Sequence, residues 1–151
     1  MRVSLKLDIT TGDVIIPREV DYSFHLMFEN RTIQVKAYNL NTILAEKIES
    51  ILARNVANTR ARDYYDVFIL LTTRTGEIDK TELIEAVKRK AVERGTIIYI
   101  EQHKKYLTDI RESRDLLALW NAYQSKYSYA ADIDYSAIMD CLAAVFQESM
   151  A

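Results

Sequence analysis

The first 40 residues alternate between apolar and polar side chains, a period typical of half-buried β-strands. A first alternating run covers residues 2–9 and is followed by a turn-like segment at residues 10–13. Two further runs, residues 22–28 and 32–37, are separated by the polar pair Glu29-Asn30. Two alternating runs around a short polar break predict a β-hairpin.

After Tyr38 the period of the apolar positions becomes helical. We expect a first helix after Asn41 or Thr42, either of which is a suitable N-cap. Its apolar stripe at helical spacing consists of Leu44, Ile48, Ile51 and Leu52. Further helices are predicted at about residues 60–72, 79–94, 113–126 and 134–149. Residues 97–110 join a strand-like apolar start to a polar continuation, and the pattern leaves strand and helix open.

These elements predict an α+β fold in one compact domain. A small N-terminal antiparallel sheet fragment, residues 1–39, precedes a C-terminal helical bundle, residues 40–151. The first strand has no element before it and leaves a strand edge to be covered. We therefore expect the sheet to be small, or to be completed by another chain or by a second copy of this one.

The composition excludes several classes of protein. The 151 residues are 49% hydrophobic and 28% charged with a net charge of −2, which fits a soluble globular domain and not a general polyanion binder. One cysteine excludes an internal disulfide, and two distant histidines do not make a metal site. Three glycines leave no glycine-rich phosphate loop. No apolar run approaches about 18 residues, so we expect a cytoplasmic protein without membrane contact.

Four charged residues fall on the first two predicted helices. Lys47 and Arg54 are seven residues apart and share one side of the first helix, beside its apolar stripe. Asp63 and Asp66 are three residues apart and share a face of the next helix. The spacing fits two packed helices joined by ordinary ion pairs, and it also fits a functional cluster.

The same segment resembles a known family. The similarity is to the AbiEii/AbiGii abortive-infection toxins, which are nucleotidyltransferase-fold toxins of type IV toxin–antitoxin systems and act in phage resistance. It is carried by Leu44-Ala45-Glu46-Lys47, by Arg54 and by Arg62-Asp63-Tyr64-Tyr65-Asp66. Residues 5–13, 33–38 and the last helix are also similar to the corresponding segments of that family.

The resemblance implies a reaction and a set of residues. Members transfer a nucleotide from a nucleoside triphosphate, with Mg²⁺, to an acceptor such as the 3′ end of a tRNA. Such chemistry needs carboxylates and a cation around the phosphates. By resemblance, Lys47 contacts the nucleotide phosphates and Arg54 supports phosphate binding. Asp66, or in second place Asp63, is the acidic residue of the later motif, with Arg62 beside it, and Asp8 resembles the third carboxylate of the fold.

The sequence also departs from the family pattern. Members carry a Gly-Ser or Gly-Gly motif and an Asp-x-Asp strand that hold the metals, and neither precedes Asp8 here. Asp132-Ile133-Asp134 matches Asp-x-Asp by its letters only and suits a helix cap. We therefore expect the C-terminal part of such a toxin, a truncated nucleotidyltransferase-fold remnant that is inactive alone or needs a complementing half.

Two alternatives remain beside the split enzyme. The chain is a non-catalytic domain that binds nucleotide, RNA or protein, or it is a structural homodimer formed through its first strands. An antitoxin is a further possible partner by resemblance. The ten tyrosines either stack on bases or fill helix contacts, and the run Lys88-Arg89-Lys90 with Arg94 is either a solvated face or an RNA contact.

Overall fold

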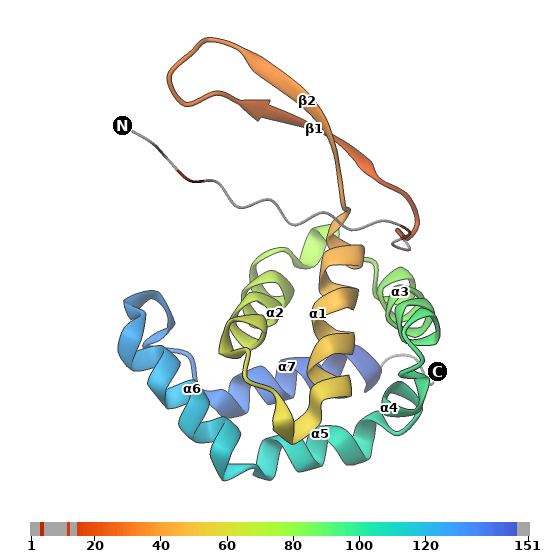
Figure 1. Ribbon diagram of the computed structural model, residues 1–151, viewed down its shortest axis with the longest axis vertical. Coiled ribbons are helices and arrows are strands. Elements are labelled where there is room, and N and C mark those ends of the chain that lie inside the picture. The colour runs from red at the N-terminus through yellow and green to blue at the C-terminus, as the bar shows by residue number, and fades with distance from the viewer. Residues whose placement is uncertain (1–3, 5–11, 13–14, 148–151) are drawn as a thin grey trace.

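The computed structural model describes residue 4, residue 12 and residues 15–147. This part of the chain forms a two-stranded antiparallel sheet followed by seven α-helices, which confirms the predicted α+β class (Figure 1). The elements are β1 (Val20–His25), β2 (Thr32–Ala37), α1 (Leu40–Arg54), α2 (Ala61–Thr73), α3 (Lys80–Glu93), α4 (Ile97–Glu101), α5 (His103–Glu112), α6 (Arg114–Lys126) and α7 (Tyr135–Gln147). The strand expected at residues 2–9 lies outside the described residues.

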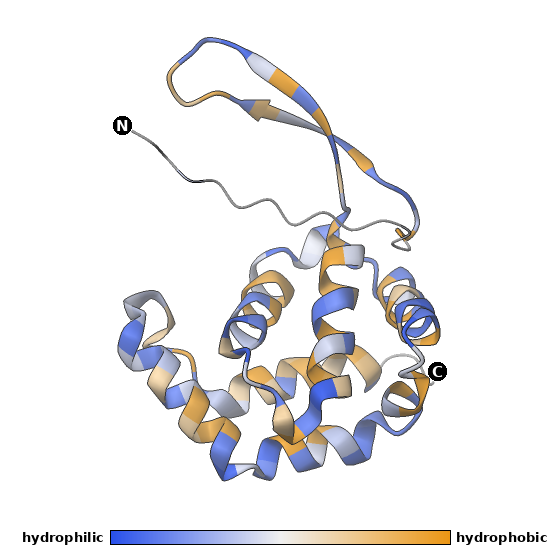
Figure 2. Ribbon diagram, in the orientation of Figure 1, coloured by the Kyte–Doolittle hydropathy of each residue, from blue (hydrophilic) through white to orange (hydrophobic). Residues whose placement is uncertain are grey.

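The predicted hairpin is confirmed, although its first strand is Val20–His25 and not residues 22–28, and it projects from one end of the helical body (Figure 1). Tyr22 pairs with Val35 and Phe24 with Ile33, so these side chains share one face of the sheet. With Val20, they form what we call the apolar hairpin face. Its five side chains are 41–54% exposed within the described structure. The opposite face is polar, and Figure 2 shows the two kinds of residue alternating along both strands.

Helix α1 is the centre of the helical body and lies between α2 and α3 (Figure 1). The four residues of its predicted apolar stripe are completely buried. They pack in one core with apolar side chains from all the other helices, whose hydrophobic sides face inward in Figure 2. Trp120 of α6 is buried there too, and its indole Nε1 donates a 3.0 Å hydrogen bond to the carbonyl oxygen of Ile133.

The N-cap of α1 differs from the prediction. Asn39 caps the helix through its side-chain oxygen, which accepts a 2.8 Å hydrogen bond from the backbone N–H of Thr42. The prediction of Asn41 or Thr42 as the cap is therefore wrong, because both residues lie buried inside the first turn. There, the Thr42 hydroxyl bonds the backbone N–H and carbonyl of Ile16, each at 3.0 Å. The first turn of α1 thus anchors the segment that leads into the hairpin.

Residues 97–110, which the sequence pattern left open, are helical. They form α4 and most of α5, and Ile100 and Leu107 are buried in the core. Burial of these apolar side chains against the other helices outweighs the strand propensity of the Ile-Ile-Tyr-Ile run. None of the helices in the described part of the chain is both long and apolar enough to cross a bilayer.

The basic run on α3 is not the uniformly solvated face that its sequence suggested. Lys90 is only 2% exposed, and its ammonium lies 3.5 Å from Glu46 and Glu93. Arg94 contacts Glu49 of α1 at 2.6 Å and Glu46 at 3.1 Å. Lys90 and Arg94 thus link α3 and its C-terminal end to α1 through ion pairs.

Candidate functional site

The structure brings Lys47 of α1 together with two carboxylates of α2. The Lys47 ammonium lies 2.7 Å from Asp66 Oδ2 and 3.2 Å from Asp63 Oδ1. All three side chains are partly buried, with 23% of Lys47, 16% of Asp63 and 23% of Asp66 exposed. We call these three residues the Lys47 cluster. It is held by packed helices and remains open to solvent on one side.

Helix geometry explains why these residues meet. Lys47 directly precedes the buried Ile48, so it lies at the edge of the α1 stripe that faces α2. Asp63 and Asp66 are one turn apart and point from α2 toward it, because the buried Tyr64 and Val67 beside them fix the rotation of α2. The pairing that the sequence left open between the two helices is therefore real.

The other predicted site residues are placed as follows. Arg62 lies next to the cluster, with its Nε 3.8 Å from Asp66 Oδ2, but its side chain is 79% exposed. Arg54 does not join the cluster in the described structure, since its Nε donates a 3.1 Å hydrogen bond to Ser50 on its own helix. Asp8 lies outside the described residues.

A group of tyrosines beside the cluster was not singled out as a site by the sequence analysis. Tyr65 of α2 meets Tyr129 at a ring-centroid distance of 4.8 Å and Tyr123 of α6 at 6.3 Å. Tyr127 lies 4.7 Å from Tyr123 and 5.4 Å from Tyr129. In sequence these residues are scattered among ten tyrosines, and only the spacing of residues 123, 127 and 129 hints that they meet.

The tyrosine group and the Lys47 cluster are electrostatically linked. Burial raises the pKa of the Tyr123 phenol above its usual range. A 2.9 Å hydrogen bond with Tyr129 and the nearby charge of Asp66 raise that pKa further, while Arg62 lowers it. Tyr123 therefore stays a neutral phenol near the carboxylates throughout the physiological range.

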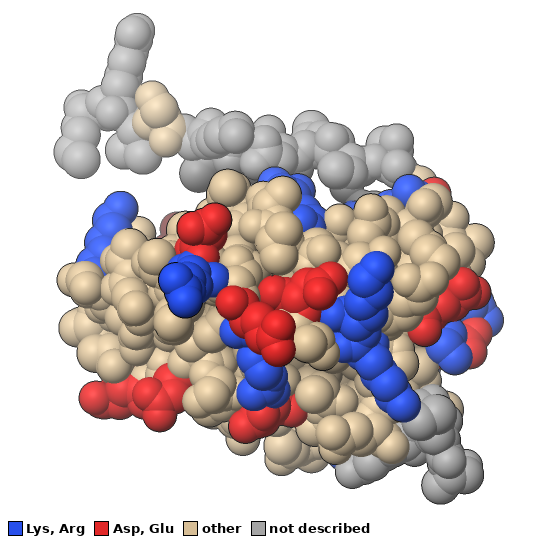
Figure 3. All heavy atoms as spheres, turned by 90° about the horizontal axis from the view of Figure 1, so that it is seen from below, with Lys and Arg blue, Asp and Glu red and all other residues tan. Residues whose placement is uncertain are grey.

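The surface does not carry one dominant charge. On the face seen in Figure 3, acidic and basic side chains lie side by side and do not gather into a patch of one sign. This agrees with the net charge of −2 and with the many short ion pairs of the helices, such as Arg111 with Asp140 at 2.6 Å. Any polyanion must therefore be recognised by a local group of cations.

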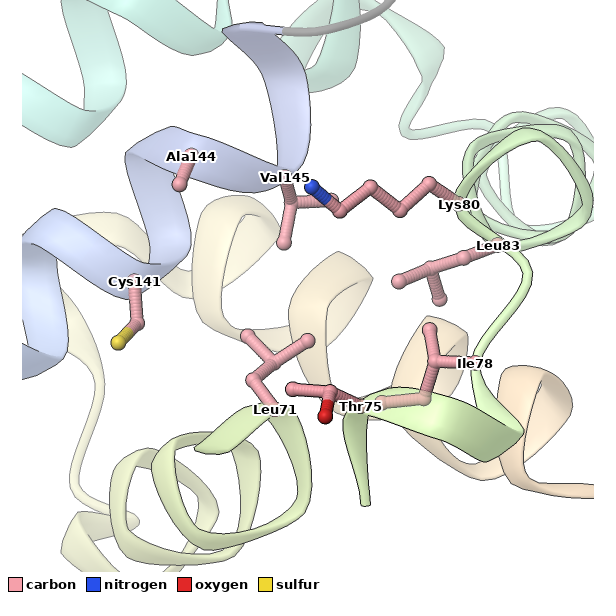
Figure 4. A pocket seen from close by; sticks show the side chains of 8 residues that line it. All are labelled: Leu71, Thr75, Ile78, Lys80, Leu83, Cys141, Ala144 and Val145. Carbon is pink, nitrogen blue, oxygen red and sulfur yellow. The ribbon is translucent and has the colours of Figure 1, made fainter. Parts of the chain in front are cut away.

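A separate pocket of about 190 Å³ lies between α2, α3 and α7. Figure 4 shows that Leu71, Leu83 and Val145 point into it, with Cys141 at one side. Burial first, and then the charge of Asp140, raises the pKa of the Cys141 thiol. A thiol shifted in this direction is a weak nucleophile, and the lining is mainly apolar, so this pocket is not a site for phosphate chemistry.

The Lys47 cluster places one ammonium beside two carboxylates, so an anion binds to Lys47 there by taking the place of a carboxylate contact. An ammonium attracts phosphate oxygens, and a neighbouring carboxylate is able to accept a proton or a hydroxyl hydrogen bond. Among the described residues there is no group of three or more His, Cys, Asp or Glu side chains that could hold a metal ion.

Comparison with known families identifies the class. The family model described as the nucleotidyl transferase AbiEii toxin of type IV toxin–antitoxin systems matches residues 1–144. The chain therefore belongs to the AbiEii family of nucleotidyl transferase toxins, as its motifs indicated. No match was found among curated proteins or among solved structures. Membership of a toxin–antitoxin family implies an antitoxin partner.

Proposed function

We propose that this chain supplies the Lys47 side of a nucleotidyl-transfer site, which moves a nucleotide from a nucleoside triphosphate to a hydroxyl group on RNA, such as the 3′ end of a tRNA. The observation that carries the proposal is the ammonium of Lys47 held between Asp63 and Asp66 at a half-open junction of α1 and α2. The family match covers this segment.

The residues have separate roles in this proposal. Lys47 binds the triphosphate and neutralises the charge that develops as pyrophosphate leaves. Asp66 accepts the proton of the acceptor hydroxyl, whose oxygen forms the new bond to phosphorus while the bond to pyrophosphate breaks. Asp63 holds Lys47 in position, and Arg62 and Arg54 lend positive charge at longer range.

Magnesium ions would supply charge neutralisation around the reacting phosphate, as in the family's chemistry. The Lys47 cluster does not fit a two-metal site, since both of its carboxylates already face an ammonium and no third carboxylate accompanies them among the described residues. In the proposal, the metal-binding carboxylates come from a complementing half, and Asp8 contributes beside them.

The apolar hairpin face is where the complementing half docks in this proposal. A two-stranded hairpin alone is marginally stable in water. Here Phe24 and Tyr22 are more than half exposed, and Met27 and Phe28 at the tip are 86% and 94% exposed. Together, these side chains and the rest of the face expose on the order of several hundred Å² of apolar surface, a size at which exposed patches mark interaction sites.

The first test is isothermal titration of the purified chain with each nucleoside triphosphate, with and without Mg²⁺. Saturable micromolar binding that is lost in Lys47→Met and kept in Lys88→Met supports the assignment, because Lys88 is an exposed lysine elsewhere. Lys47→Arg keeps the charge and should keep most of the binding. Absence of binding to every triphosphate contradicts the proposed role of Lys47.

Transfer is tested by adding the separately purified metal-binding half of another family member. Labelled nucleotide should appear in tRNA only when both proteins and Mg²⁺ are present, and Asp66→Asn should abolish it. Undiminished transfer by Asp66→Asn removes Asp66 from the site.

The exposed hairpin also favours a second candidate, a homodimer in which two hairpin faces meet and no complementing half is needed. Light scattering after size exclusion separates the two candidates. A dimer that Tyr22→Ser and Phe24→Ser convert to a monomer favours the structural homodimer, whereas a monomeric chain favours a different partner. Ser23→Ala on the polar face is the control.

A further inference from the structure

Beside the Lys47 cluster lies an open groove that contains two of the predicted site residues, Arg62 and Asp63, and extends beyond them to α6. It runs between the start of α2 and the outer side of α6, and its volume is about 510 Å³. Asp63 forms part of its wall as well as part of the Lys47 cluster. Whatever occupies the groove therefore reaches Asp63, and Asp66 lies one helical turn further along α2.

The groove concentrates positive charge in an otherwise slightly acidic chain. Arg60 and Arg62 line it from α2 and its N-terminal flank, and Lys126 lines it from the last turn of α6. The only carboxylate in the described lining is Asp63, whose charge is balanced by Lys47 at 3.2 Å. Three exposed cations within one groove match successive phosphates of a polyanion, not a single neutral ligand.

Aromatic rings line the same groove. Tyr123 and Tyr127 both face it, with ring centroids 4.7 Å apart. The ammonium of Lys126 lies 5.4 Å from the Tyr127 ring, so a cation and a π-surface adjoin at its edge. Phosphate-binding cations interleaved with tyrosine rings are typical of surfaces that bind unpaired nucleotides, because a base must leave its helix to stack on a ring.

We propose that this groove binds the single-stranded end of a nucleic acid and delivers its terminal hydroxyl to Asp63 and Asp66. Arg60, Arg62 and Lys126 hold the phosphates, and a base stacks on Tyr127. The proposal rests on the function proposed above for the Lys47 cluster, and it adds a strand-binding surface on α6 that lies outside the Lys47-to-Asp66 segment. Phosphate binding also explains why Arg62 is exposed, which its 3.8 Å contact with Asp66 does not explain.

The chain offers a matched control within itself. Lys105 and Tyr106 of α5 form the same pair as Lys126 and Tyr127, with the ammonium 5.5 Å from the ring. Neither residue lines the groove. Substitutions at the two pairs therefore remove the same lysine and tyrosine groups, once inside the groove and once outside it.

The test is fluorescence anisotropy of the full chain with a labelled eight-nucleotide single-stranded RNA, the same sequence as DNA, and a blunt RNA duplex. We expect both single strands to bind more tightly than the duplex. Tyr127→Leu should weaken single-strand binding about tenfold, as loss of one stacked base does. Lys126→Ala should weaken it and lower the slope of log K against log salt by about 0.7. Tyr106→Leu and Lys105→Ala should leave binding within about twofold of the unchanged protein.

Three outcomes overturn the proposal: no binding of any oligonucleotide, equal affinity for duplex and single strand, or equal losses at the two pairs. Lys47→Met separates this proposal from the previous one: it should remove triphosphate binding, and it should only weaken strand binding, since Asp63 in the groove wall loses the cation 3.2 Å away that balances its charge. Triphosphate binding without strand binding refutes the groove alone. Strand binding without triphosphate binding refutes the role of Lys47 alone.

Discussion

Replacing Lys47 by methionine should measure how strongly the Lys47 cluster joins α1 to α2. Methionine keeps most of the apolar stem and removes the ammonium, leaving Asp63 and Asp66 without their 3.2 Å and 2.7 Å contacts. Exposed ion pairs contribute about 0.2–1 kcal/mol, whereas breaking a fully buried pair costs about 3–5 kcal/mol. Since 16–23% of each side chain is exposed, we expect a loss of about 2 kcal/mol in the free energy of unfolding.

The assay is urea unfolding at pH 7, followed by circular dichroism, with a thermal scan alongside. For a chain of this size, a loss of about 2 kcal/mol lowers the melting temperature by roughly 4–8 °C. Lys47→Arg should restore most of the stability, and adding Asp66→Asn to Lys47→Met should recover about 1 kcal/mol, since the two residues are coupled. Lys88→Met is the matched control. If it destabilises the protein as much as Lys47→Met does, the ion pairs contribute nothing and the reasoning is refuted.

Two further predictions concern buried groups. Burial raises the pKa of Tyr135 to about 12, so wild-type stability should fall from pH 10 toward pH 12, by roughly 2 kcal/mol from this group. Tyr135→Phe loses the hydrogen bond to the Ile110 carbonyl and should cost about 1 kcal/mol at pH 7. Urea unfolding between pH 10 and pH 12 should then show a smaller loss of stability with pH than in the wild type. An equal loss in both proteins contradicts the role of Tyr135. Arg94→Ala leaves the buried Glu49 carboxylate without its ion pair and should cost about 2–3 kcal/mol. Arg89→Ala on α3 should cost under about 0.5 kcal/mol, because its partner is exposed. Equal losses in urea unfolding would refute the difference.

Much of the fold follows from periodicity alone. The hairpin is predictable because apolar and polar residues alternate along both of its strands. The α1 stripe is predictable because apolar residues recur at helical spacing on the side that faces the core. Residues 97–110 are not predictable in this way. Their helical state depends on tertiary burial of Ile100 and Leu107, which no local pattern contains.

The candidate site, too, is predictable from the sequence only in part. Lys47, Asp63 and Asp66 are singled out in the sequence by the family resemblance, because helical spacing shows only that the two aspartates share a face of one helix. That they meet Lys47 across α1 and α2 is seen only in the structure. The groove is not found, because it joins Arg60 to residues 123–127, more than 60 positions away along the chain. The buried state of Lys90 is missed for the same reason, since its partner Glu46 lies on another helix. The groove and the burial of Lys90 both depend on contacts between distant parts of the chain, and a run of charges in the sequence does not reveal such contacts.

The hairpin described above has a consequence for how long the free protein survives in a cell. Two paired strands with alternating exposed Tyr22, Phe24, Ile33 and Val35 form a template for cross-β association. Each copy without a partner is therefore prone to aggregate and to be degraded by proteases. Aggregation also becomes faster as the concentration of the free protein rises. A binding partner that covers the hairpin would act as a stabiliser of the polypeptide itself, so that the amount of toxin in a cell follows the amount of that partner.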